Sequence, residues 1–324
     1  MKVLVTGGGG FVGRYLCKAL KERNWETFVI DIKPFEESGL KKDMVDKYVE
    51  GEITNYEKVR QAMDGIDMVI HLAAKHRFFG ITEEEFYRVN VEGTKNILKA
   101  MDDCGVKKIF FYSSVAVYGD HRSPTNENVI PKPTSIYGKS KLEAEKKIEE
   151  WVEKGNKRGA LILRPTVIFG PENRGNIYRL IRQIDRYLFI PVGEGNNIKS
   201  TAYVENIINA TMFLIDRGFE GVEIYSYADE PHLSFKEIVT IIYKYLGKSM
   251  PKLRLPVKAV LAGLKPVDSI SSFFNIDLPF TAAVEKMNKT THHEAKKIRQ
   301  IGFKQIFSLE EGLERTIRWY KNKK

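Results

Sequence analysis

The chain has 324 residues, which is more than one ordinary domain requires, so we expect one large α/β unit or two closely joined domains. Hydrophobic residues make up 43% and charged residues 29%, proportions that exclude a disordered, collagen-like or low-complexity protein. The formal net charge of +10 favours an anionic partner, such as a phosphate group, a nucleic acid or an acidic membrane surface.

Short apolar runs alternate with longer amphipathic stretches through the first half of the chain. The runs rich in β-branched and aromatic residues predict strands at 3–5, 27–30, 68–72, 109–112 and 160–163. The stretches with helical spacing predict helices at 11–23, 55–64, 83–103 and 139–154. Because strands that alternate with helices form parallel sheets covered on both faces, the sequence predicts an α/β fold with a doubly wound parallel sheet of the Rossmann type.

The second half of the chain is less regular. Glycines and prolines loosen the pattern after residue 163, and a further strand is expected near 223–227, with helices near 234–247 and 308–321. We therefore expect a Rossmann domain at 1–168, to which 203–228 returns. The remaining segments, 169–202 and 229–324, are expected to form a smaller C-terminal lobe that binds the substrate.

Two features of the sequence bear on its cellular location. Cys17 and Cys104 cannot supply a disulfide framework or a four-ligand zinc site, so we expect a reducing compartment and no metal. No apolar run reaches the roughly 18–20 residues that span a bilayer, and Met1 leads directly into a strand rather than a signal sequence. These patterns predict a cytoplasmic protein.

A glycine-rich turn from Thr6 to Gly13 directly follows the first predicted strand and opens the first predicted helix. Gly7, Gly10 and Gly13 allow a tight turn and a close approach of the backbone to a ligand. The N–H groups at the start of a helix stabilise the negative charge of a pyrophosphate. The strand–turn–helix context therefore favours a dinucleotide site over a turn with no ligand.

Asp31 ends the second predicted strand. An acidic side chain at this place accepts hydrogen bonds from an adenosine ribose and repels a 2′-phosphate. This favours NAD over NADP. Lys33 nearby weakens the exclusion of NADP, and an Asp at a strand end can also cap a helix.

Ser114, Tyr137 and Lys141 form a possible catalytic group. Ser114 follows the strand predicted at 109–112, and Tyr137 and Lys141 stand four residues apart, so they share one face of a helix. A tyrosine with a pKa of about 10 acts as a base near neutral pH only with positive charge nearby, which Lys141 and an oxidised nicotinamide would supply. Ser114 would orient the same substrate hydroxyl group. A lone Tyr-x-x-x-Lys pair is more often a surface pair, but its place after a dinucleotide motif favours catalysis.

With these residues in this order, the chain resembles the extended short-chain dehydrogenase/reductase family, and in particular its sugar epimerase and dehydratase branch. The resemblance extends over nearly the whole chain. Its further motifs are Gly51-Glu52-Ile53, His71-Leu72-Ala73-Ala74, Val89 to Thr94 and Ser113 to Gly119. It implies that Ser114, Tyr137 and Lys141 are catalytic, and that a homodimer forms through helices near 83–103 and 139–154.

The resemblance also implies an NAD site. Glu52 stands where the family more often has Asp, and the segment from Arg164 to Val167 is expected near the nicotinamide half. Besides Tyr137 and Lys141, the residues expected to bind the cofactor are Gly7, Gly10, Phe11, Val12, Gly13, Asp31, Ile32, Glu52, Ile53, Leu72, Ala73, Ala74, Asn90, Pro165 and Val167.

The residues after Ser114 separate the reactions of this branch. The similar 4,6-dehydratases have an Asp-Glu pair there and the related decarboxylases a Glu, because elimination or decarboxylation needs a further acid or base. Here Val115 and Ala116 follow Ser114. The resemblance therefore implies C4 epimerisation through a 4-keto intermediate, or a simple oxidation or reduction.

The substrate is expected to be a sugar diphosphate. Val167 and Lys199 replace the Asn and Arg of similar nucleotide-sugar epimerases, and the segments from Arg164 and Lys199 look most like epimerases of N-acetylglucosamine carried on polyprenyl diphosphate. The carrier is either UDP or a polyprenyl lipid. The residues expected to bind the substrate are Ser114, Arg174, Asn176, Arg179 and Lys199, and the alternative for the cations among them is a solvated loop.

A stretch from Tyr243 to Pro266 has six Lys or Arg residues and no Asp or Glu, interleaved with apolar residues. This composition suits an anionic interface, so peripheral association with the inner face of the cytoplasmic membrane is one interpretation. The other is a helix that packs on the core with its lysines in water.

Two other functions compete with the epimerase. One is a net NAD(P)-dependent oxidoreductase, such as a 4-ketosugar reductase or a hydroxysteroid-type dehydrogenase. The other is a noncatalytic relative that senses NAD or binds nucleic acid, which the net charge permits. The complete Ser114, Tyr137 and Lys141 set argues against the second, and the basic residues are not organised around stacking aromatics, so no nucleic acid partner is expected.

Overall fold

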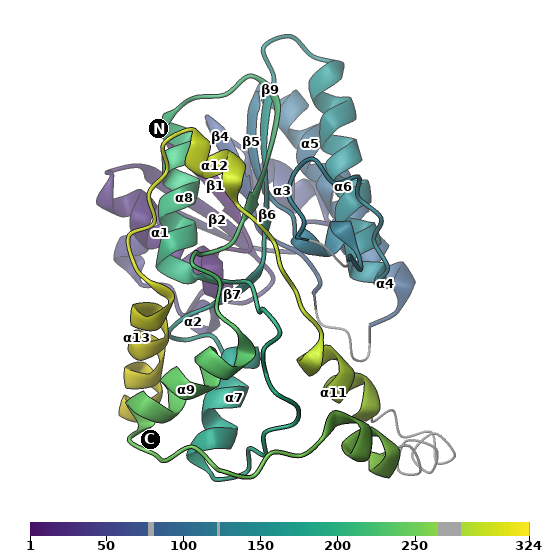
Figure 1. Ribbon diagram of the computed structural model, residues 1–324. Coiled ribbons are helices and arrows are strands. Elements are labelled where there is room, and N and C mark those ends of the chain that lie inside the picture. Colours follow the sequence, from purple (N-terminus) through teal and green to yellow (C-terminus); the bar gives the residue numbers. More distant parts are fainter. Residues whose placement is uncertain (77–80, 122–123, 265–279, 324) are drawn as a thin grey trace. The chain divides into compact units, whose positions relative to one another are not determined.

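The computed structural model describes residues 1–76, 81–121, 124–264 and 280–323 (Figure 1). The chain divides into two compact units, which are described separately. Unit 1 comprises Met1–Ile168, Val204–Ala228 and His293–Ile306, and unit 2 comprises Phe169–Tyr203, Asp229–His292 and Phe307–Lys324.

Unit 1 contains a parallel sheet with the strand order β3-β2-β1-β4-β5-β6-β9, and the predicted doubly wound sheet is confirmed. Its central strands are continuous apolar runs because helices cover both faces, and every residue of β4 and β6 is buried. The strands are β1 (Lys2–Thr6), β2 (Glu26–Asp31), β3 (Lys47–Glu50), β4 (Met68–His71), β5 (Lys108–Tyr112), β6 (Gly159–Pro165) and β9 (Gly221–Tyr227). The prediction missed β3, whose burial is incomplete at the edge of the sheet.

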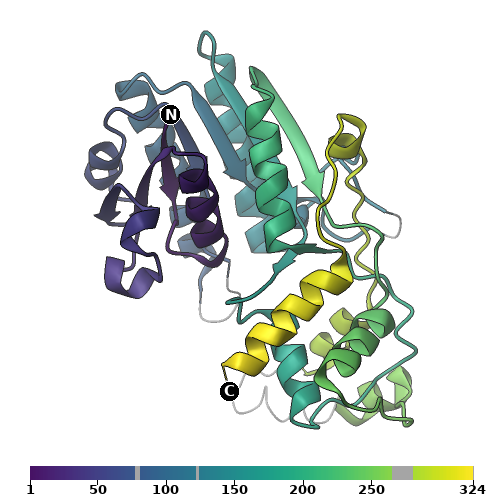
Figure 2. The same cartoon turned by 90° about the vertical axis from the view of Figure 1, so that its left-hand side faces the viewer.

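Helices lie on both faces of this sheet (Figures 1 and 2). On one face α1 (Phe11–Glu22) contacts α8 (Val204–Asp216), and on the other α5 (Gly93–Asp103) lies between α3 (Tyr56–Ala62) and α6 (Ile136–Glu153). The shorter elements of unit 1 are α2 (Phe35–Ser38), α4 (Glu83–Tyr87), α12 (Lys296–Gln300) and the 3₁₀ turns Lys42–Met44 and Val115–Tyr118.

The helix predicted at 83–103 is interrupted. A wide π turn at Arg88–Glu92 separates α4 from α5. A π turn adds a residue to the helical repeat and changes the direction of the side chains that follow. Val89, Asn90 and Val91 are all buried there, although an α-helix on a sheet would normally turn one face to water.

Residues 293–306 pack in unit 1, whereas the sequence assigned them to the smaller lobe. Lys297 Nζ donates to the Ile224 carbonyl at 2.7 Å, and the Arg299 guanidinium donates to the Ala228 carbonyl at 3.0 Å. The Phe303 ring lies 5.9 Å from the Tyr227 ring. These contacts with β9 and the residue after it hold the segment, and they join parts of the chain too distant in sequence for local patterns to reveal.

Unit 2 is mainly helical. Its elements are α7 (Asn176–Asp185), β8 (Thr201–Tyr203), α9 (Phe235–Leu246), α11 (Phe280–Asn288), α13 (Leu309–Asn322) and a helix at 257–264, while β7 (Val167–Phe169) spans the boundary between the units. Ser234 is the N-cap of α9 and Ser308 is the N-cap of α13, and each forms a capping box with the Glu three residues later. The Tyr178 ring on α7 lies 5.9 Å from Trp319 and 5.6 Å from Tyr320 on α13, and this aromatic cluster joins the two helices.

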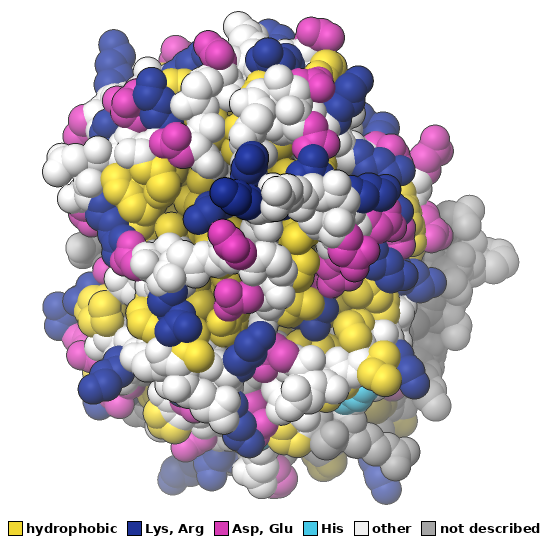
Figure 3. Space-filling view, turned by 90° about the horizontal axis from the view of Figure 1, so that it is seen from above, with side chains coloured by type: hydrophobic (Ala, Val, Ile, Leu, Met, Phe, Trp, Pro, Cys, Tyr) yellow, Lys and Arg dark blue, Asp and Glu magenta, His cyan; other side chains and the backbone are white. Residues whose placement is uncertain are grey.

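The described part of the chain has no helix that is both long and apolar enough to cross a bilayer. On the face shown in Figure 3, basic and acidic side chains are interspersed among the coloured residues. The excess of positive charge is therefore not gathered into one basic surface on that face.

We predict that Gly13→Ala destabilises unit 1. A Cβ atom at Gly13 would lie 2.5 Å from the Gly7 carbonyl oxygen and 2.6 Å from the Gly8 Cα, so the glycine turn would have to move. Overpacking of this kind lowers the free energy of unfolding by about 1–3 kcal/mol, which urea denaturation measures. Gly263→Ala is the control, because a Cβ there meets nothing within 4 Å. Equal effects of the two substitutions would contradict the steric argument.

Candidate active site

The glycine turn forms a cradle between β1 and α1. Gly7 has φ +74°, and its N–H donates to the Ile30 carbonyl at 2.8 Å, which ties the turn to β2. Gly10 N–H donates back to the Gly7 carbonyl at 3.0 Å, and Gly10 begins α1 without a side-chain cap. The first N–H groups of α1 therefore remain for a ligand, as a bound pyrophosphate requires. Phe11 and Val12, predicted cofactor residues, are half-buried in the first turn of α1.

Asp31 lies beside this cradle at the end of β2. One carboxylate oxygen accepts a hydrogen bond from Gly9 N–H at 2.9 Å, and the other accepts one from Lys33 N–H at 3.0 Å. These bonds fix a negative charge next to the phosphate cradle, where a ribose hydroxyl could still share the carboxylate. Ile32 follows with 61% of its surface exposed, so it offers an apolar surface of the kind that an adenine ring covers.

The cradle lies where the order of strands reverses. β1 is flanked by β2 and β4, and the chain leaves these two neighbours towards opposite edges of the sheet, which is where doubly wound proteins bind dinucleotides. A Cβ atom at Gly7 would come within 2.9 Å of the Ala73 backbone. The backbone of Leu72 and Ala73 therefore runs directly beside the glycine turn, and the contact of these residues and of Ala74 with a cofactor stays a prediction.

His71, which the prediction of site residues left out, lies at the end of β4 and links it to β1. Its imidazole contacts the Thr6 hydroxyl at 2.7 Å and the Thr94 hydroxyl at 3.0 Å. Burial lowers the pKa of His71 well below its ordinary value, and the Lys141 charge lowers it further, so both effects favour the neutral ring. Thr6 also accepts a hydrogen bond from Ala73 N–H at 3.2 Å, so this chain of contacts fixes the backbone beside the glycine turn. In the sequence, a polar residue at the end of an apolar strand was the feature that could have indicated His71 as a site residue.

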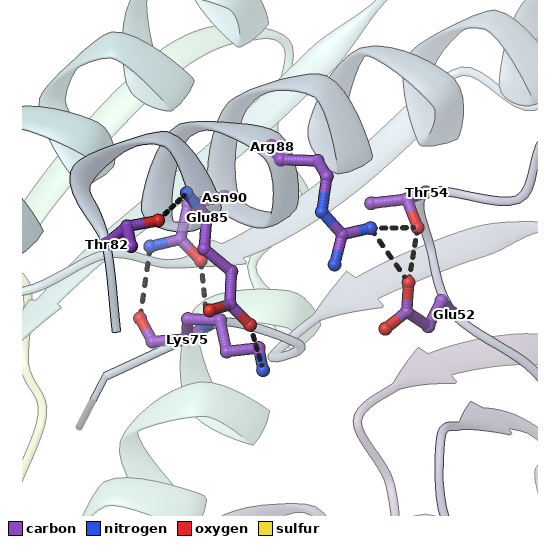
Figure 4. Close-up of polar contacts among 7 residues, drawn as sticks. All are labelled: Glu52, Thr54, Lys75, Thr82, Glu85, Arg88 and Asn90. Atoms are coloured by element: carbon purple, nitrogen blue, oxygen red, sulfur yellow. Dashed lines mark hydrogen bonds and ion pairs between the residues drawn. The ribbon is translucent and has the colours of Figure 1, made fainter. Parts of the chain in front are cut away.

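The Asn90 side chain fixes the loop that follows β4 through its contacts with Lys75 (Figure 4). Its oxygen accepts from Lys75 N–H at 2.8 Å, and its NH₂ group donates to the Lys75 carbonyl at 3.1 Å and to the Ser140 hydroxyl at 2.9 Å. The buried amide thus joins the loop after β4, the π turn and α6. Asn90 supports the predicted cofactor contacts at Ala73 and Ala74 through the backbone of this loop.

Glu52 and Arg88 form an ion pair at 3.0 Å, and Thr54 donates to the same carboxylate at 2.7 Å (Figure 4). The Thr54 and Arg88 hydrogen bonds lower the pKa of Glu52. Lys75 pairs with Glu85 at 2.8 Å, which attaches the loop after β4 to α4. The side chain of Ile53 is buried in the core against α5, so only its backbone is placed to meet a cofactor.

Ser114, Tyr137 and Lys141 come together through the ends of β5 and α6. Ser114 caps the 3₁₀ turn that follows β5, and its hydroxyl accepts from Ala116 N–H at 3.1 Å. Ser135 caps α6 through Gly138 N–H at 3.0 Å, which fixes Tyr137 in the first turn of the helix. Burial raises the pKa of Tyr137 to about 12, and a hydrogen bond between the Tyr137 and Ser114 side chains acts in the opposite direction.

Lys141 lies one helical turn after Tyr137 and is buried. Its Nζ is 3.9 Å from the centre of the Phe111 ring on β5, a distance suited to a cation–π contact. Burial lowers the pKa of Lys141 to about 7, and the Glu145 carboxylate opposes this shift. Of these two causes, the Glu145 carboxylate is the one that favours the charged amine.

Glu145 also pairs with Arg164 in the interior of unit 1. The guanidinium donates to the two carboxylate oxygens at 3.0 and 2.6 Å, and the side chains are only 4% and 1% exposed. Arg164 donates further to the Tyr118 hydroxyl at 3.1 Å. Burial alone would lower the pKa of Arg164, but the bonds with Glu145 outweigh it and raise the pKa above its ordinary value. The Arg164 side chain is therefore held by Glu145, and Glu145 is a residue that the sequence prediction did not include.

Two hydroxyl groups at adjacent strand ends have no hydrogen-bond partner within the described residues. They belong to Ser113, which follows β5, and Thr166, which follows β6, and both are buried. Pro165 beside Thr166 is buried, whereas Val167 is 48% exposed. Unused buried hydroxyls, the glycine cradle and the fixed Asp31 carboxylate fit a dinucleotide along the carboxyl ends of these strands.

Within unit 2, Arg174 and Arg179 are exposed, and Asn176 is the exposed first residue of α7. Lys199 Nζ donates to the carbonyls of Lys286 and Lys289 at the end of α11, at 2.9 and 2.5 Å. Burial lowers the pKa of Lys199 to about 8, and the charges of Lys286 and Lys289 lower it further. The predicted cation thus has two cationic neighbours that sequence reasoning missed. No group of three metal-ligating side chains occurs among the described residues of the two units.

A family model described as the NAD dependent epimerase/dehydratase family matches residues 3–227. The chain belongs to this family. The comparison confirms the family predicted from the sequence, and with it an enzyme that uses NAD. In this epimerase/dehydratase member, the match spans the glycine turn, Asp31 and the Ser114, Tyr137 and Lys141 group.

Two curated relatives match almost the whole chain. An N-acetyl-alpha-D-glucosaminyl-diphospho-ditrans,octacis-undecaprenol 4-epimerase of Escherichia coli O157:H7 is 37% identical over 323 residues, which are 98% of this chain and 94% of the relative. A 3 beta-hydroxysteroid dehydrogenase/Delta 5→4-isomerase of vaccinia virus (strain Ankara) is 29% identical over 342 residues, with 97% of each chain covered. Among solved structures, a UDP-glucuronic acid 4-epimerase from Bacillus cereus in complex with NAD has a TM-score of 0.78 at 22% identity and covers 99% of this chain and 97% of that chain. The last likeness shows the fold.

We predict that breaking the buried ion pair destabilises the enzyme strongly. Glu145→Gln and Arg164→Met each leave a buried charge without its partner, which costs about 3–5 kcal/mol of the free energy of unfolding by urea denaturation. The double variant Glu145→Gln/Arg164→Met, which combines the same two substitutions, should lose less than the sum of the two single losses. Glu150→Gln on the exposed face of the same helix is the matched control and should leave stability unchanged. Single variants as stable as this control would refute the role of the pair.

Proposed function

We propose that this protein is an NAD-dependent C4 epimerase whose substrate is a hexose or N-acetylhexosamine linked to a diphosphate, with polyprenyl diphosphate favoured over UDP as the carrier. The observation that carries the proposal is the group of Ser114, Tyr137 and Lys141, in which the Ser114 and Tyr137 side chains are hydrogen-bonded. Ser114 follows a strand of the same parallel sheet as the glycine cradle, and the residues after it are Val115 and Ala116 rather than acids. The 37% identity to the undecaprenol-linked 4-epimerase over nearly all of both chains supports the reaction and the carrier.

In the proposed mechanism the side chains of the protein accept and return a single proton. When bound, NAD supplies the nicotinamide that takes a hydride from the sugar C4 and returns it. The Tyr137 oxygen accepts the proton of the 4-hydroxyl group and later gives it back, while the Ser114 hydroxyl orients the sugar oxygen. Lys141 provides positive charge one helical turn away, which favours the phenolate form that burial alone disfavours. Asp31, Glu52 and the glycine turn would hold the cofactor.

The residues after Ser114 support epimerisation over dehydration. Val115 and Ala116 lie in the 3₁₀ turn after β5 and carry no acid or base. An exchange of hydride and proton at one carbon requires no acid or base beyond Tyr137, because the same side chain can remove and restore the proton. If the 4-keto sugar rotates in the site and presents its opposite face before the hydride returns, the configuration at C4 is inverted.

A net oxidoreductase is the second candidate. The 29% identity to a viral 3 beta-hydroxysteroid dehydrogenase over 97% of this chain supports it, because the same Ser, Tyr and Lys chemistry serves a single oxidation. The two functions differ in cofactor balance. An epimerase turns over with NAD that is regenerated in each cycle, whereas a dehydrogenase accumulates NADH.

We further propose that the enzyme acts in the cytoplasm, at the inner face of the membrane, as a homodimer. The chemistry of a polyprenyl-linked substrate supports the membrane face, since its lipid remains in the bilayer. The exposed surfaces of the helices near 83–103 and 139–154 are proposed for the dimer. Cross-linking and light scattering test this assembly.

Incubation with sugar substrates tests the reaction. We predict that the purified protein converts polyprenyl-diphosphate N-acetylglucosamine to its C4 epimer faster than it converts UDP-N-acetylglucosamine, without added reductant. Tyr137→Phe removes one oxygen and little volume, so it should lower turnover by at least about 10²-fold while NAD binding persists. Analysis of the released sugars measures both. Near-normal turnover by Tyr137→Phe would refute its role as the acid and base, and steady NADH release would favour the oxidoreductase.

Titration with both cofactors tests the role of Asp31. We predict tighter binding of NAD than of NADP, because the carboxylate held by Gly9 and Lys33 N–H groups would repel a 2′-phosphate. Asp31→Ala should lower the ratio of NAD affinity to NADP affinity by about 10-fold or more. Glu36→Ala is the control, since Glu36 lies on α2 with its side chain in solvent. A clear preference of the unaltered protein for NADP would contradict the assignment.

A further inference from the structure

Large apolar side chains are exposed at one edge of unit 2. Tyr187 is 80% exposed, Leu188 69%, Ile190 56% and Leu253 69%. The first three follow the end of α7, and the fourth lies between α9 and the helix at 257–264. Single exposed apolar residues are common on soluble proteins, but several together indicate a surface that contacts something.

The two segments lie side by side. Leu255 N–H donates to the Pro191 carbonyl at 2.9 Å, and Gly193 N–H donates to the Leu255 carbonyl at 2.9 Å, as in a short parallel pair of strands. Lys248 joins them again at the end of α7, where its Nζ donates to the Asp185 carbonyl at 2.7 Å. Ile190 and Leu253 therefore lie on backbone segments that run side by side, and Tyr187 and Leu188 lie between Ile190 and the end of α7.

Tyr187 has an unusual backbone conformation for its residue type. Its φ is +59°, and it follows Arg186, the C-cap residue of α7, at a position where glycine is favoured. Its ring is exposed except where Lys248 Nζ lies 3.5 Å from the ring centre. Folding alone gives no reason for an exposed aromatic ring at this position, since glycine would end the helix with less strain.

The same edge is positively charged. Residues 182–195 and 247–258 contain six Lys or Arg and two Asp or Glu, a balance of 6 − 2 = +4. Both acids already have cationic partners, because Asp185 pairs with Lys248 at 3.8 Å and Glu194 with Arg254 at 3.6 Å. The remaining cations, Arg182, Arg186, Lys252 and Lys258, have exposed side chains.

We propose that this edge, formed by Tyr187, Leu188, Ile190 and Leu253 with Arg186 and Lys252 around them, docks on an anionic lipid surface. Aliphatic and aromatic side chains enter the boundary between headgroups and acyl chains, while Lys and Arg bind the lipid phosphates. A second copy of the chain is a poorer occupant, because it would bring an equal positive charge to the same surface. The inference deepens the proposed function, since a polyprenyl-linked sugar lies at such a surface.

Sedimentation with vesicles tests the proposal. The full-length protein should bind vesicles of phosphatidylglycerol and phosphatidylcholine and remain unbound with phosphatidylcholine alone, and about 0.5 M salt should weaken the binding. Leu188→Ser/Leu253→Ser should lower the vesicle affinity by about tenfold or more, because it removes two apolar groups from the lipid contact. Lys252→Glu should lower it at low salt more than at high salt.

Matched changes on unit 1 provide the controls. Ile130 and Ile306 are 73% and 60% exposed, so Ile130→Ser/Ile306→Ser removes the same kind of surface elsewhere. Lys107 is an exposed lysine of unit 1, so Lys107→Glu makes the same charge change in the unit that does not carry the proposed surface. Both controls should bind the anionic vesicles as the unaltered protein does, and all variants should keep their thermal unfolding midpoint and their NAD affinity.

Three results would overturn the docking surface. They are failure of the unaltered protein to bind anionic vesicles, equal losses in the edge and control variants, and dissociation of an oligomer by Leu188→Ser/Leu253→Ser, which would assign the edge to a second copy of the chain. Activity on polyprenyl-linked sugar in detergent separates this inference from the proposed function. Activity without vesicle binding leaves the epimerase and removes the docking surface, whereas vesicle binding without activity leaves the docking surface and removes the epimerase.

Discussion

The buried carboxylate of Glu145 is the interaction that ties the proposed catalytic group of unit 1 to the sheet. It accepts two hydrogen bonds from Arg164 on β6 and lies one turn after Lys141 on α6, so one negative charge faces two cations away from water. In a medium of low polarity such a charge is stable only with its partners in place. The position of α6 on the sheet, the charge of Lys141 and the setting of Tyr137 are therefore linked through one side chain.

The parallel sheet determines where the rest of the site is placed. The seven strands of the sheet point in one direction, so the residues that follow β1, β4, β5 and β6 meet at the same edge. Backbone position matters there as much as side-chain chemistry. His71 and Asn90 act through the loop after β4, because their hydrogen bonds hold backbone groups that approach the glycine turn. The cofactor side of the site is thus supported by polar residues buried behind it.

Local patterns in the sequence were sufficient for the glycine turn, Asp31 and the Tyr137 and Lys141 pair, because strand–turn–helix order and a spacing of four residues determine those geometries directly. They were not sufficient for Glu145 and Arg164, whose pairing depends on how α6 lies on β6. The same reason applies to His71, which joins β1 to α5, and to residues 293–306, which return to β9. The sequence predicted one continuous helix at 83–103 and missed the π turn. In the structure, Val89, Asn90 and Val91 are all buried there, which the repeat of a regular α-helix does not predict.

The π turn at Arg88–Glu92 makes the length of this helical region a functional property. One additional residue in the turn places α4 and α5 out of phase by about 100° relative to a continuous α-helix. Phe86 before the turn faces the Tyr137 ring at 6.3 Å, while Thr94 after it reaches His71. Loss of a single residue between them would restore a regular helix and turn one of these contacts away. The number of residues in the turn, and not only their identity, therefore decides whether Phe86 and Thr94 can reach their partners at the same time.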